Sequence, residues 1–523
     1  MSKVWKHYTV VTQQNETISY SAASLSIVGV ERLQLQQQIL PFQLIIPYLQ
    51  RLSRDNPESK IEWENYPNTQ RIRRLLVCPS FLNEAIKSVI PVISLDGAHM
   101  DSKWKGTLLT ASALSSNREL YLIAFAFTEG NEDHQTWDWF LLHLRSILST
   151  LDSPYGDGTC PYKKYVFVSD RCKGLKTALE ERFGANLSTS CAFHIKENVR
   201  TLYGGVAAKY VVAIAKEFSV REEQRLLSTV GLVSPAAYNY LCRIPKDVWR
   251  STQWTQEELP RRYGIVTSNT SEAVNSWLKD ARSLTWSSAL ETIVDKMINR
   301  ISDSREKYKG KPDEEIVPFV KQLLTKRWRM IAGYVVKNIE HRAGVYKVNE
   351  NRGDDSDREE GRDNEVLSPE EPMEELPQGP AQVVQPGIKE CSCGKWQEHQ
   401  YPCRHALAYF RLWEERAFSW ILENEVNDLW RYKTLKQLYG PNLFPVVMSS
   451  VRGDGETQPP RVRRSAGRPR RRRLRRRMQR DGMVILPDTN DLGVSSDEES
   501  DEGPIESERN SDDRNESYED SME

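Results

Sequence analysis

The sequence predicts an α/β fold built on a mixed β-sheet, followed by a small metal-binding module. Three observations predict this organisation. Short apolar runs bounded by turn residues follow one another from Pro91 onward, which is typical of strands. Segments with apolar residues at three- and four-residue spacing, typical of helices, lie between the later runs. Farther along the chain, three Cys and one His fall within fifteen residues, a density typical of metal ligands.

The first strands follow one another directly. Apolar runs at residues 91–95, 107–114 and 120–127 are separated by turn signals, so we expect an antiparallel start to the sheet. The first run ends at Asp96-Gly97. A helix is expected over residues 135–151, because apolar side chains recur there on one helical face: Trp137, Phe140, Leu141, Leu144 and Ile147.

The second half of the predicted sheet alternates strands with helices. A strand at residues 165–168 stops at Ser169-Asp170 and is followed by a helix with Leu175, Ala178, Leu179 and Phe183 on one side. A further strand is expected at residues 187–193. Three strands, a helix, a strand, a helix and a strand form the order of an RNase H-like core. Residues 195–335 are predicted to be mostly helical, as an insertion followed by closing helices.

Bulk composition fits two domains with charged tails. The 523 residues are 39% hydrophobic, enough to bury a sizeable core in part of the chain. The formal net charge of -1 hides strong local charges, because residues 461–480 carry twelve Arg whereas residues 484–523 carry fifteen Asp or Glu. Eight Cys without an N-terminal signal indicate a reducing compartment. The apolar stretches are shorter than the roughly 20 residues that span a bilayer, so we expect a soluble intracellular protein and no membrane partner.

Composition also divides the chain into parts. Residues 351–376 hold eleven acids against three Arg, a composition that does not fold on its own. We expect an N-terminal accessory region (1–85), the α/β domain (86–345) with its helical insertion (about 195–265), an acidic disordered linker (346–387), a zinc-binding region (388–448), an Arg-rich segment (455–480) and an acidic disordered tail (481–523).

The strongest local motif predicts a zinc site. It consists of two tight pairs, Cys391-x-Cys393 and Cys403-x-His405, separated by nine residues. Four thiolate and imidazole ligands suit tetrahedral Zn2+, and each pair can hold the metal from one turn. Reduced cysteines that cluster by chance are the weaker alternative. His399 is the nearby competitor as a ligand.

Two acids at predicted strand ends are candidate catalytic residues. A carboxylate beside a buried strand is costly unless it is solvated, hydrogen-bonded or bound to a metal. Asp96 could instead form a turn before Gly97, and Asp170 could cap the following helix. Adjacent strands one and four of an RNase H-like sheet would bring both carboxylates to one edge.

Glu272 is the third candidate, and the sequence around it is ambiguous. In residues 267–278, Val274, Trp277 and Leu278 can face a core while Glu272 and Asn275 share the opposite side of a helix. Asn269 followed three residues later by Glu272 is also a helix-capping pattern. From these residues alone, the capping role is the favoured interpretation.

A family resemblance adds weight to these acids. The chain resembles the Mutator-like element (MULE) transposase domain over roughly residues 40–340, in Ser94-Leu-Asp-Gly-Ala-His99, Lys105-Gly106, Ala124-Phe-Ala126, Glu132, Trp137-Asp-Trp-Phe140, Ser169-Asp-Arg171, Gly174-Leu175, Cys191-Ala-Phe-His194 and Asn198. The Cys/His motif and the Pro402-Cys-Arg-His405 segment, which leads into an apolar helix, resemble the SWIM zinc finger. The acidic linker separates the two more widely than we expect for this family.

The resemblance implies an activity, cofactors and partners. Asp96, Asp170 and Glu272 match the family's catalytic DDE triad, which implies Mg2+ or Mn2+ at these acids in addition to Zn2+ at the finger. By analogy with the fold, Asp96 would bridge two ions while Asp170 and Glu272 each hold one. Cys191 and His194 accompany the triad as a core-associated pair. The implied enzyme cuts DNA at transposon terminal inverted repeats and joins the 3′-hydroxyl ends to target DNA, as a homodimer or higher oligomer.

Two other functions remain open at this stage. The chain could be a domesticated transcription regulator that keeps the transposase fold and DNA binding without catalysis. It could also be a protein-interaction adaptor in which the SWIM module binds a protein partner.

The Arg-rich segment predicts contact with DNA or nuclear import. Gly467-Arg468-Pro469-Arg470, flanked by further Arg, resembles an AT-hook, whose extended backbone lies in the narrow minor groove of A·T-rich DNA. A nuclear-import signal is an equally good interpretation of the same residues. Either interpretation leads us to expect a nuclear protein.

Overall fold

The computed structural model describes most of the chain between residues 39 and 460. The description omits residues 58, 80–84, 103, 150–160, 171–172, 185–186, 255–258, 340–343, 351–380 and 441–443. Farther toward the N-terminus it gives the backbone of two antiparallel strands, β1 (Tyr8–Val11) and β2 (Thr17–Tyr20). Within the described residues, no helix is both long and apolar enough to cross a membrane.

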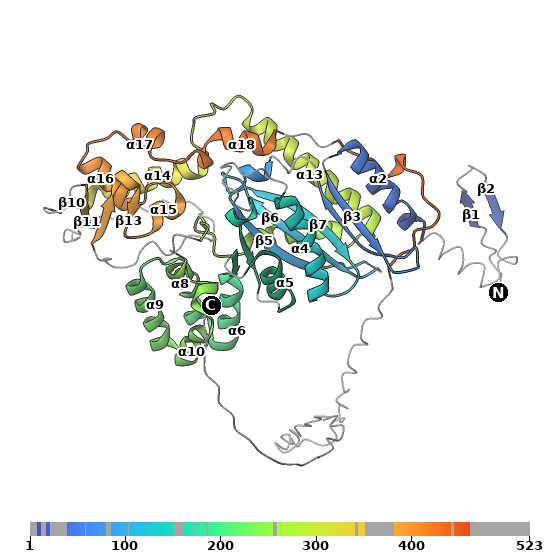
Figure 1. Ribbon diagram of the computed structural model, residues 1–523, viewed down its shortest axis with the longest axis horizontal. Coiled ribbons are helices and arrows are strands. Elements are labelled where there is room, and N and C mark those ends of the chain that lie inside the picture. The colour runs from blue at the N-terminus through green and yellow to red at the C-terminus, as the bar shows by residue number, and fades with distance from the viewer. Residues whose placement is uncertain are drawn as a thin grey trace, which may run out of the picture. The chain divides into compact units, whose positions relative to one another are not determined.

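A seven-stranded mixed sheet organises the first part of the chain (Figure 1). Its order is β3-β4-β7-β6-β5-β8-β9, and β8 pairs in parallel with both of its neighbours, β5 and β9. The predicted α/β class is confirmed, and this order is compatible with an RNase H-like core. The strands are β3 (Lys60–Asn65), β4 (Ile72–Cys78), β5 (Val92–His99), β6 (Thr107–Leu114), β7 (Leu120–Thr128), β8 (Val166–Ser169) and β9 (Ser188–Ser190).

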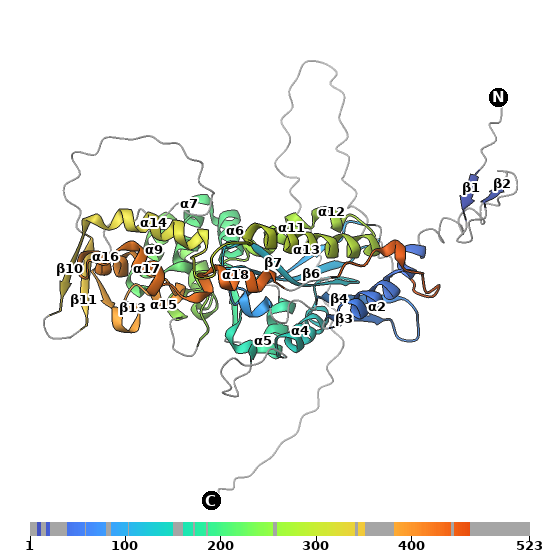
Figure 2. The ribbon, with the colours of Figure 1, turned by 90° about the horizontal axis from the view of Figure 1, so that it is seen from above.

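Helices cover both faces of this sheet (Figure 2). One face carries α2 (Ile45–Asp55), α4 (His134–Ser149) and α5 (Lys173–Phe183), and the other carries α11 (Asn269–Trp277), α12 (Lys279–Arg282) and α13 (Trp286–Tyr308). Burial on both faces explains why β7 is a continuous apolar run with every residue buried. The fully buried rings of Trp137 and Trp286 belong to the hydrophobic core that encloses the sheet.

Several elements differ in extent from the sequence prediction. The strand expected to end at residue 95 continues as β5 to His99, because Asp96 and Gly97 pair with Thr110 and Leu109 of β6. The last strand of the core ends early, since α6 begins at Ala192. Residues 60–78, expected in an accessory region, instead form β3 and β4, which extend the main sheet beyond β7.

The expected helical insertion forms between β9 and α11. Its helices have their own small core, which includes Ile195, Val211 and Leu226. A buried ion pair between Arg250 and Glu223, 2.7 Å long, lies among them. The insertion contains α6 (Ala192–Tyr203), α7 (Gly205–Ala208), α8 (Val211–Lys216), α9 (Val220–Val233) and α10 (Pro235–Arg243).

The C-terminal part of the described chain centres on a four-stranded antiparallel sheet that follows α14 (Pro318–Met330). Its strands are β10 (Tyr334–Asn338), β11 (Tyr346–Glu350), β12 (Gln382–Gln385) and β13 (Glu390–Cys391). Three helices complete it: α15 (Lys395–His399), α16 (Arg404–Leu412) and α17 (Phe418–Asn424). The last helix, α18 (Tyr432–Tyr439), packs instead against α13 of the first part.

This sheet changes the interpretation of the acidic segment. β11 and β12 both lie inside residues 346–387, which the sequence assigns to a linker, yet they pair with one another at Tyr346 and Val384. The acidic residues 351–376 therefore connect two paired strands of one module. A boundary at residue 345 or 388 would divide a hydrogen-bonded sheet.

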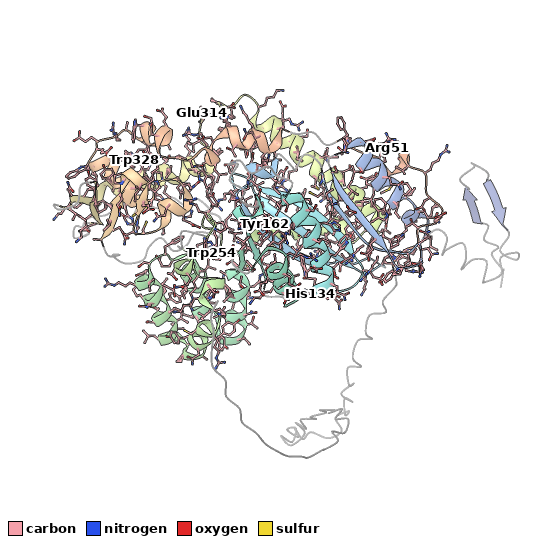
Figure 3. The ribbon with its side chains drawn as sticks, viewed as in Figure 1. Arg51, His134, Tyr162, Trp254, Glu314 and Trp328 are labelled. Atoms are coloured by element: carbon pink, nitrogen blue, oxygen red, sulfur yellow. The ribbon has the colours of Figure 1, made fainter. Side chains whose placement is uncertain are left out.

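Buried polar contacts join the C-terminal module to the segment that precedes α11. The amide of Arg262 donates to the Glu398 carboxylate of α15 at 2.9 Å, and both side chains are buried. The Arg262 guanidinium lies 4.8 Å from the ring centroid of Trp254, which is labelled in Figure 3. Burial lowers the pKa of Arg262 to about 10, although Glu398 opposes this shift. Residues leading into α11 are thus anchored to the module that carries the Cys/His motif.

Candidate active site and zinc centre

Asp96 and Asp170 lie at neighbouring positions of two parallel strands. Ser94 of β5 is paired with Val168 of β8, and each Asp lies two residues beyond its paired residue. Because side chains alternate along a strand, both acids continue the same side of the sheet as this pair. The turn interpretation of Asp96 is wrong, since this residue lies inside β5. The N-cap interpretation of Asp170 stays open, since α5 is described only from Lys173 and residues 171–172 lie outside the described residues.

The Asp96 carboxylate accepts two hydrogen bonds. The amide of Gly97 donates to Oδ1 at 3.0 Å, and Nδ2 of Asn275 in α11 donates to Oδ2 at 2.8 Å. Burial, followed by the charge of Asp170, raises the pKa of Asp96 to about 6, although these hydrogen bonds and His194 oppose the rise. The fold therefore holds the Asp96 carboxylate close to a second carboxylate, that of Asp170.

Glu132 is a third acid in this neighbourhood, and the sequence did not assign it a role. Its carboxylate lies against the backbone of Gly97, where any Cβ would overlap it. Burial, and then the charges of Asp96 and Asp170, raise the pKa of Glu132 to about 7. The next residue, Asp133, accepts a hydrogen bond from the amide of Thr136 at 2.8 Å and so caps α4, which leaves Glu132 available to the acid site.

A second glycine allows this approach. A Cβ at Gly174, in the first turn of α5, would lie 2.7 Å from the backbone nitrogen of His134 and 2.9 Å from the carbonyl carbon of Asp133. The starts of α4 and α5 therefore touch through backbone. This contact brings the residues preceding each helix, Glu132 and Asp170, toward one another. One sequence signal could have identified Glu132. It is an acid directly before a helix, and the next residue, Asp133, already serves as the N-cap of that helix.

Cys191 and His194 connect the acids to α11. Cys191 follows β9 directly, its amide donates to Ser169 of β8 at 2.8 Å, and its Sγ accepts from the amide of Ser268 at 3.1 Å. Contact with the Cys191 thiol raises the pKa of His194 to about 9, and Asp170 and Asp96 contribute to the rise. The pair therefore places a cationic group beside the acids and holds the start of α11.

Glu272 occupies a different position. It is exposed in the first turn of α11, three residues before Asn275, and so lies on the side of the helix from which Asn275 reaches Asp96. The N-cap of α11 is Ser268, one residue before the position that the capping pattern requires. Among the described residues, the Cys/His motif forms a tight group of possible metal ligands, whereas Asp96, Asp170 and Glu272 do not.

The donor set of the acid site fits a hard divalent cation. Asp96, Asp170 and Glu132 offer carboxylate oxygens, the ligands that Mg2+ and Mn2+ prefer. The raised pKa values of Asp96 and Glu132 show desolvation by burial and repulsion between neighbouring acids, both of which a bound cation would relieve. Asn275 adds a buried Oδ1 that has no hydrogen-bond partner within the described residues.

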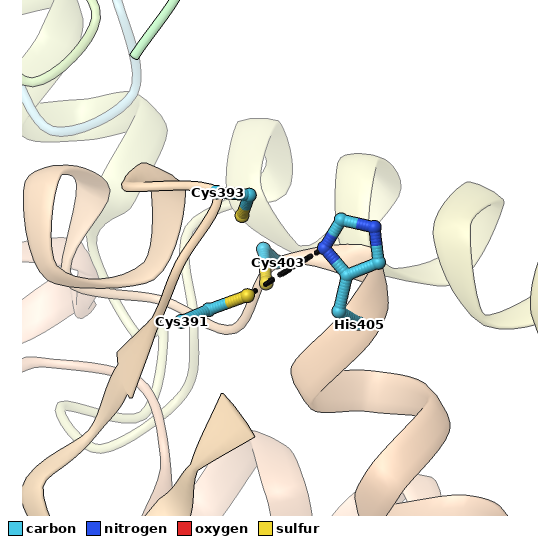
Figure 4. A group of neighbouring side chains, drawn as sticks. All are labelled: Cys391, Cys393, Cys403 and His405. Atoms are coloured by element: carbon cyan, nitrogen blue, oxygen red, sulfur yellow. Dashed lines mark hydrogen bonds between the residues drawn. The ribbon is translucent and has the colours of Figure 1, made fainter. Parts of the chain in front are cut away.

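The four residues of the Cys/His motif form a compact group (Figure 4). Their sulfur and nitrogen ligand atoms all lie within 4.8 Å of one another, and Nδ1 of His405 is 3.6 Å from Sγ of Cys391 and 3.9 Å from Sγ of Cys403. Ligand atoms of tetrahedral Zn2+ are separated by roughly 3.3–3.8 Å. Among the residues that the structure describes, no other set of three or more Cys, His, Asp or Glu is this tight. The cluster supports Zn2+ as its metal.

Local structure orients the zinc ligands. Gln397 holds the backbone of Cys391 through two hydrogen bonds, accepting from its amide at 3.2 Å and donating to its carbonyl at 3.0 Å. Cys403 is the N-cap of α16, where its Sγ accepts from the amide of Ala406. Burial alone would raise the pKa of Cys403, but hydrogen bonds from Cys391, Cys393 and Ala406 lower it well below the usual value, which favours the thiolate that binds metal.

His399 is not part of this cluster. Its ring stacks on Tyr401 with centroids 5.2 Å apart and lies against Gly264, whose φ of +72° requires glycine. Burial, aided by the charges of Arg327 and Arg118, lowers the pKa of His399 well below its usual value. His399 is therefore a neutral packing residue between the C-terminal module and the segment before α11. Gly467, Arg468, Pro469 and Arg470 lie outside the described residues.

Comparison with protein-family models gives two matches. Residues 92–198 match the MULE transposase domain, and residues 382–411 match the SWIM zinc finger. The first match includes Asp96, Glu132 and Asp170 but ends before Glu272, and the second includes all four zinc-cluster residues. No curated protein matches the chain. The chain thus contains a MULE transposase domain and a SWIM zinc finger, the combination expected of a MULE transposase.

Proposed function

We propose that this protein is a metal-dependent DNA transposase that cuts at transposon terminal inverted repeats and joins the 3′-hydroxyl ends to target DNA. The observation that carries the proposal is the position of Asp96 and Asp170. They lie on adjacent parallel strands of an RNase H-like sheet, inside the residues that match the MULE transposase domain. A transposase domain implies a DNA substrate.

In this proposal Asp96, Asp170 and Glu272 hold Mg2+ or Mn2+. Two divalent ions at such a site supply activation of the attacking oxygen and stabilisation of the leaving oxygen of a phosphodiester. Glu272 is assigned by the resemblance of its surrounding sequence to the family and by its place on the side of α11 from which Asn275 reaches Asp96. Glu132 adds a carboxylate that strengthens cation binding.

The remaining residues orient these acids. Asn275 fixes one oxygen of Asp96 by a 2.8 Å hydrogen bond, which leaves the carboxylate little rotational freedom. Cys191 holds the first turn of α11 through the amide of Ser268, so the position of Glu272 depends on the end of β8. His194 places positive charge beside the acids, where the phosphate of a DNA strand would approach.

Partners and location complete the proposal. The substrates are terminal-repeat DNA and target DNA, and the enzyme acts in the nucleus as a homodimer or higher oligomer, because two transposon ends are processed together. The twelve Arg of residues 461–480 would add sequence-independent affinity for DNA.

A cleavage assay tests the proposal. Full-length protein would be incubated with DNA carrying the sequences that flank its gene, with Mg2+ or Mn2+. We expect Asp96→Asn, Asp170→Asn and Glu272→Gln each to reduce cleavage and strand joining by about 10³-fold or more, since each removes several kcal/mol of charge stabilisation. Asp101→Asn, at an exposed acid close to β5, is the matched control and should retain activity.

Two outcomes would overturn the assignment. Cleavage that survives Asp96→Asn and Glu272→Gln would show that these acids are not the catalytic ones. A wild-type protein that binds the terminal repeats without cutting them, under metal conditions that load the site, would support a DNA-binding transcription regulator instead.

A further inference from the structure

One face of α14 is exposed, basic and unused by either metal centre. Six of its residues line an open hollow of about 640 Å³: Lys321, Gln322, Thr325, Lys326, Arg329 and Met330. Their spacing places them on one side of the helix, opposite the buried side chains of Val320 and Leu324. The polar members of this group are cations or neutral hydrogen-bonding residues.

The charged residues of α14 are all basic. Its thirteen residues contain four cations and no acid. Lys321 pairs with Glu315 at 2.9 Å, whereas Lys326 and Arg329 form no ion pair with any residue that the structure describes. A second hollow, of about 440 Å³ beside α13, differs in this respect, because its Lys296 and Lys307 are paired with Asp280 and Glu119. The α14 face therefore offers charge that the fold does not neutralise.

The strands that follow α14 carry a second basic feature. Lys337 of β10 lies directly opposite Lys347 of β11 in the antiparallel register, and both side chains are exposed. The neighbouring pair, Val336 and Val348, faces the module's core, so the two lysines share the outer face of the sheet. Like charges directly opposite one another destabilise a strand pair. No ion pair with a described residue offsets this cost, whereas an anionic partner would.

We infer that two basic surfaces of this module, the exposed face of α14 and the Lys337–Lys347 pair, each bind the sugar-phosphate backbone of DNA. The inference rests on the proposed function for the identity of the polyanion. From Lys321 to Arg329 the helix rises roughly 12 Å, enough to meet several phosphates along one strand. Gln322 and Thr325 supply neutral donors between the cations, as is common in contacts to phosphate.

Charge reversal on α14 is the first test. The double variant Lys326→Glu/Arg329→Glu leaves the Lys321–Glu315 pair intact. Lys309→Glu/Lys433→Glu makes the same charge change at two exposed lysines that do not line the hollow. Full-length proteins would be titrated with a fluorescent duplex of random sequence over a range of salt concentrations.

We expect the α14 variant to bind at least about tenfold more weakly at physiological salt. Its slope of log K against log salt should fall by about 2, because each lost phosphate contact releases about one fewer counterion. The control variant should match the wild type in affinity and slope. Both variants should retain one zinc per chain and the wild-type unfolding midpoint, which separates lost binding from lost folding.

Lys347→Glu is a second, sharper test, because two readouts should move in opposite directions. The substitution converts a repulsive cross-strand pair into an attractive one, so the midpoint of thermal unfolding should rise. Affinity for the duplex should fall severalfold. Lys347→Gln, which removes the repulsion without adding an acid, should lie between the wild type and Lys347→Glu in both measurements.

The outcomes distinguish this inference from the proposed function. Unchanged affinity and salt slope in both variants would overturn the inference, even if the wild type cleaves DNA, and would favour the chain's own acidic residues 351–376 as the partner of this face. Weakened binding in the variants of a wild type that never cleaves would support the inference and overturn the proposed catalytic activity.

Discussion

The zinc centre and the acid site differ in where their metal ligands lie in the sequence. The zinc ligands come from fifteen consecutive residues, Cys391 to His405, and their ligand atoms converge within 4.8 Å. The acids come from separate elements: Asp96 from β5, Asp170 from the end of β8, Glu132 from before α4 and Glu272 from α11. These carboxylates remain more widely separated.

The difference follows from the chemistry of the ligands. Thiols and a neutral imidazole can pack together through hydrogen bonds before any metal binds, as Cys403 and its neighbours do. Carboxylates repel one another, and burial followed by this repulsion raises the pKa values of Asp96 and Glu132. A soft-ligand site can therefore be compact on its own, whereas charge repulsion opposes the same compactness in a site of carboxylates.

The largest expected effect is the loss of zinc and of the folded C-terminal module when a zinc ligand is replaced. Cys403→Ser should reduce zinc from about one equivalent per chain to near zero and unfold the C-terminal module, since metal binding contributes directly to folding at such sites. Zinc analysis and thermal unfolding would measure this. Cys242→Ser, at an exposed cysteine, is the control. A Cys403→Ser protein that keeps its zinc would show that His399 or another residue can take the vacated position.

Glu132→Gln tests whether the acid site has more carboxylates than the family triad. The substitution keeps the shape of the side chain but removes a charge that lies against Gly97 and near Asp170. We expect the Mn2+ concentration for half-maximal DNA cleavage to rise by about 10- to 100-fold. Glu129→Gln, at the start of the same β7–α4 connection, is a matched change. Wild-type metal dependence in Glu132→Gln would restrict the site to the triad.

Stability should depend on pH in the metal-free protein and much less in the presence of a divalent cation. In the metal-free protein, the folded-state pKa values of Asp96 and Glu132 lie above their unfolded values, at about 6 and about 7. Their protonation thus stabilises the fold fully below about pH 4, and this contribution is lost as pH rises through 6 and 7.

We expect a loss on the order of 2 kcal/mol between pH 5 and pH 8, which Mn2+ should largely restore at pH 8 but not at pH 5. Denaturant unfolding at both pH values would measure it. The Asp96→Asn protein should show a smaller dependence. Equal stabilisation by Mn2+ at both pH values would place the metal elsewhere.

The smallest expected effect concerns the orientation of Asp96. Asn275→Ala removes the hydrogen bond to Oδ2 and should reduce cleavage by about tenfold. It should also shift the acidic limb of the pH–rate profile upward, because the bond favours the ionised carboxylate of Asp96. A purely structural role for Asn275 would lower stability without moving that limb. Thr292→Ala, on the neighbouring helix α13, serves as the comparison variant.

The zinc centre could be predicted from the sequence more fully than the acid site, because its ligands are close together in the chain. The zinc cluster could be identified from spacing alone, because its ligands are neighbours in the chain. Glu132 carries no such signal: it becomes a site residue because Gly97 and Gly174 leave room for close backbone approach. Asn275 was expected only to share a helix side with Glu272, and its contact with Asp96 spans 179 residues.

The sequence by itself determined the α/β class, the strand and helix order of the core, and the Cys/His cluster, because apolar periodicity and ligand spacing are local properties. The tertiary structure decided which distant residues meet. It extended the sheet with β3 and β4, placed the acidic segment between the paired strands β11 and β12, and collected Asp96, Glu132, Asp170 and His194. Such contacts arise when a sheet forms between segments far apart in the chain, and local patterns do not record them.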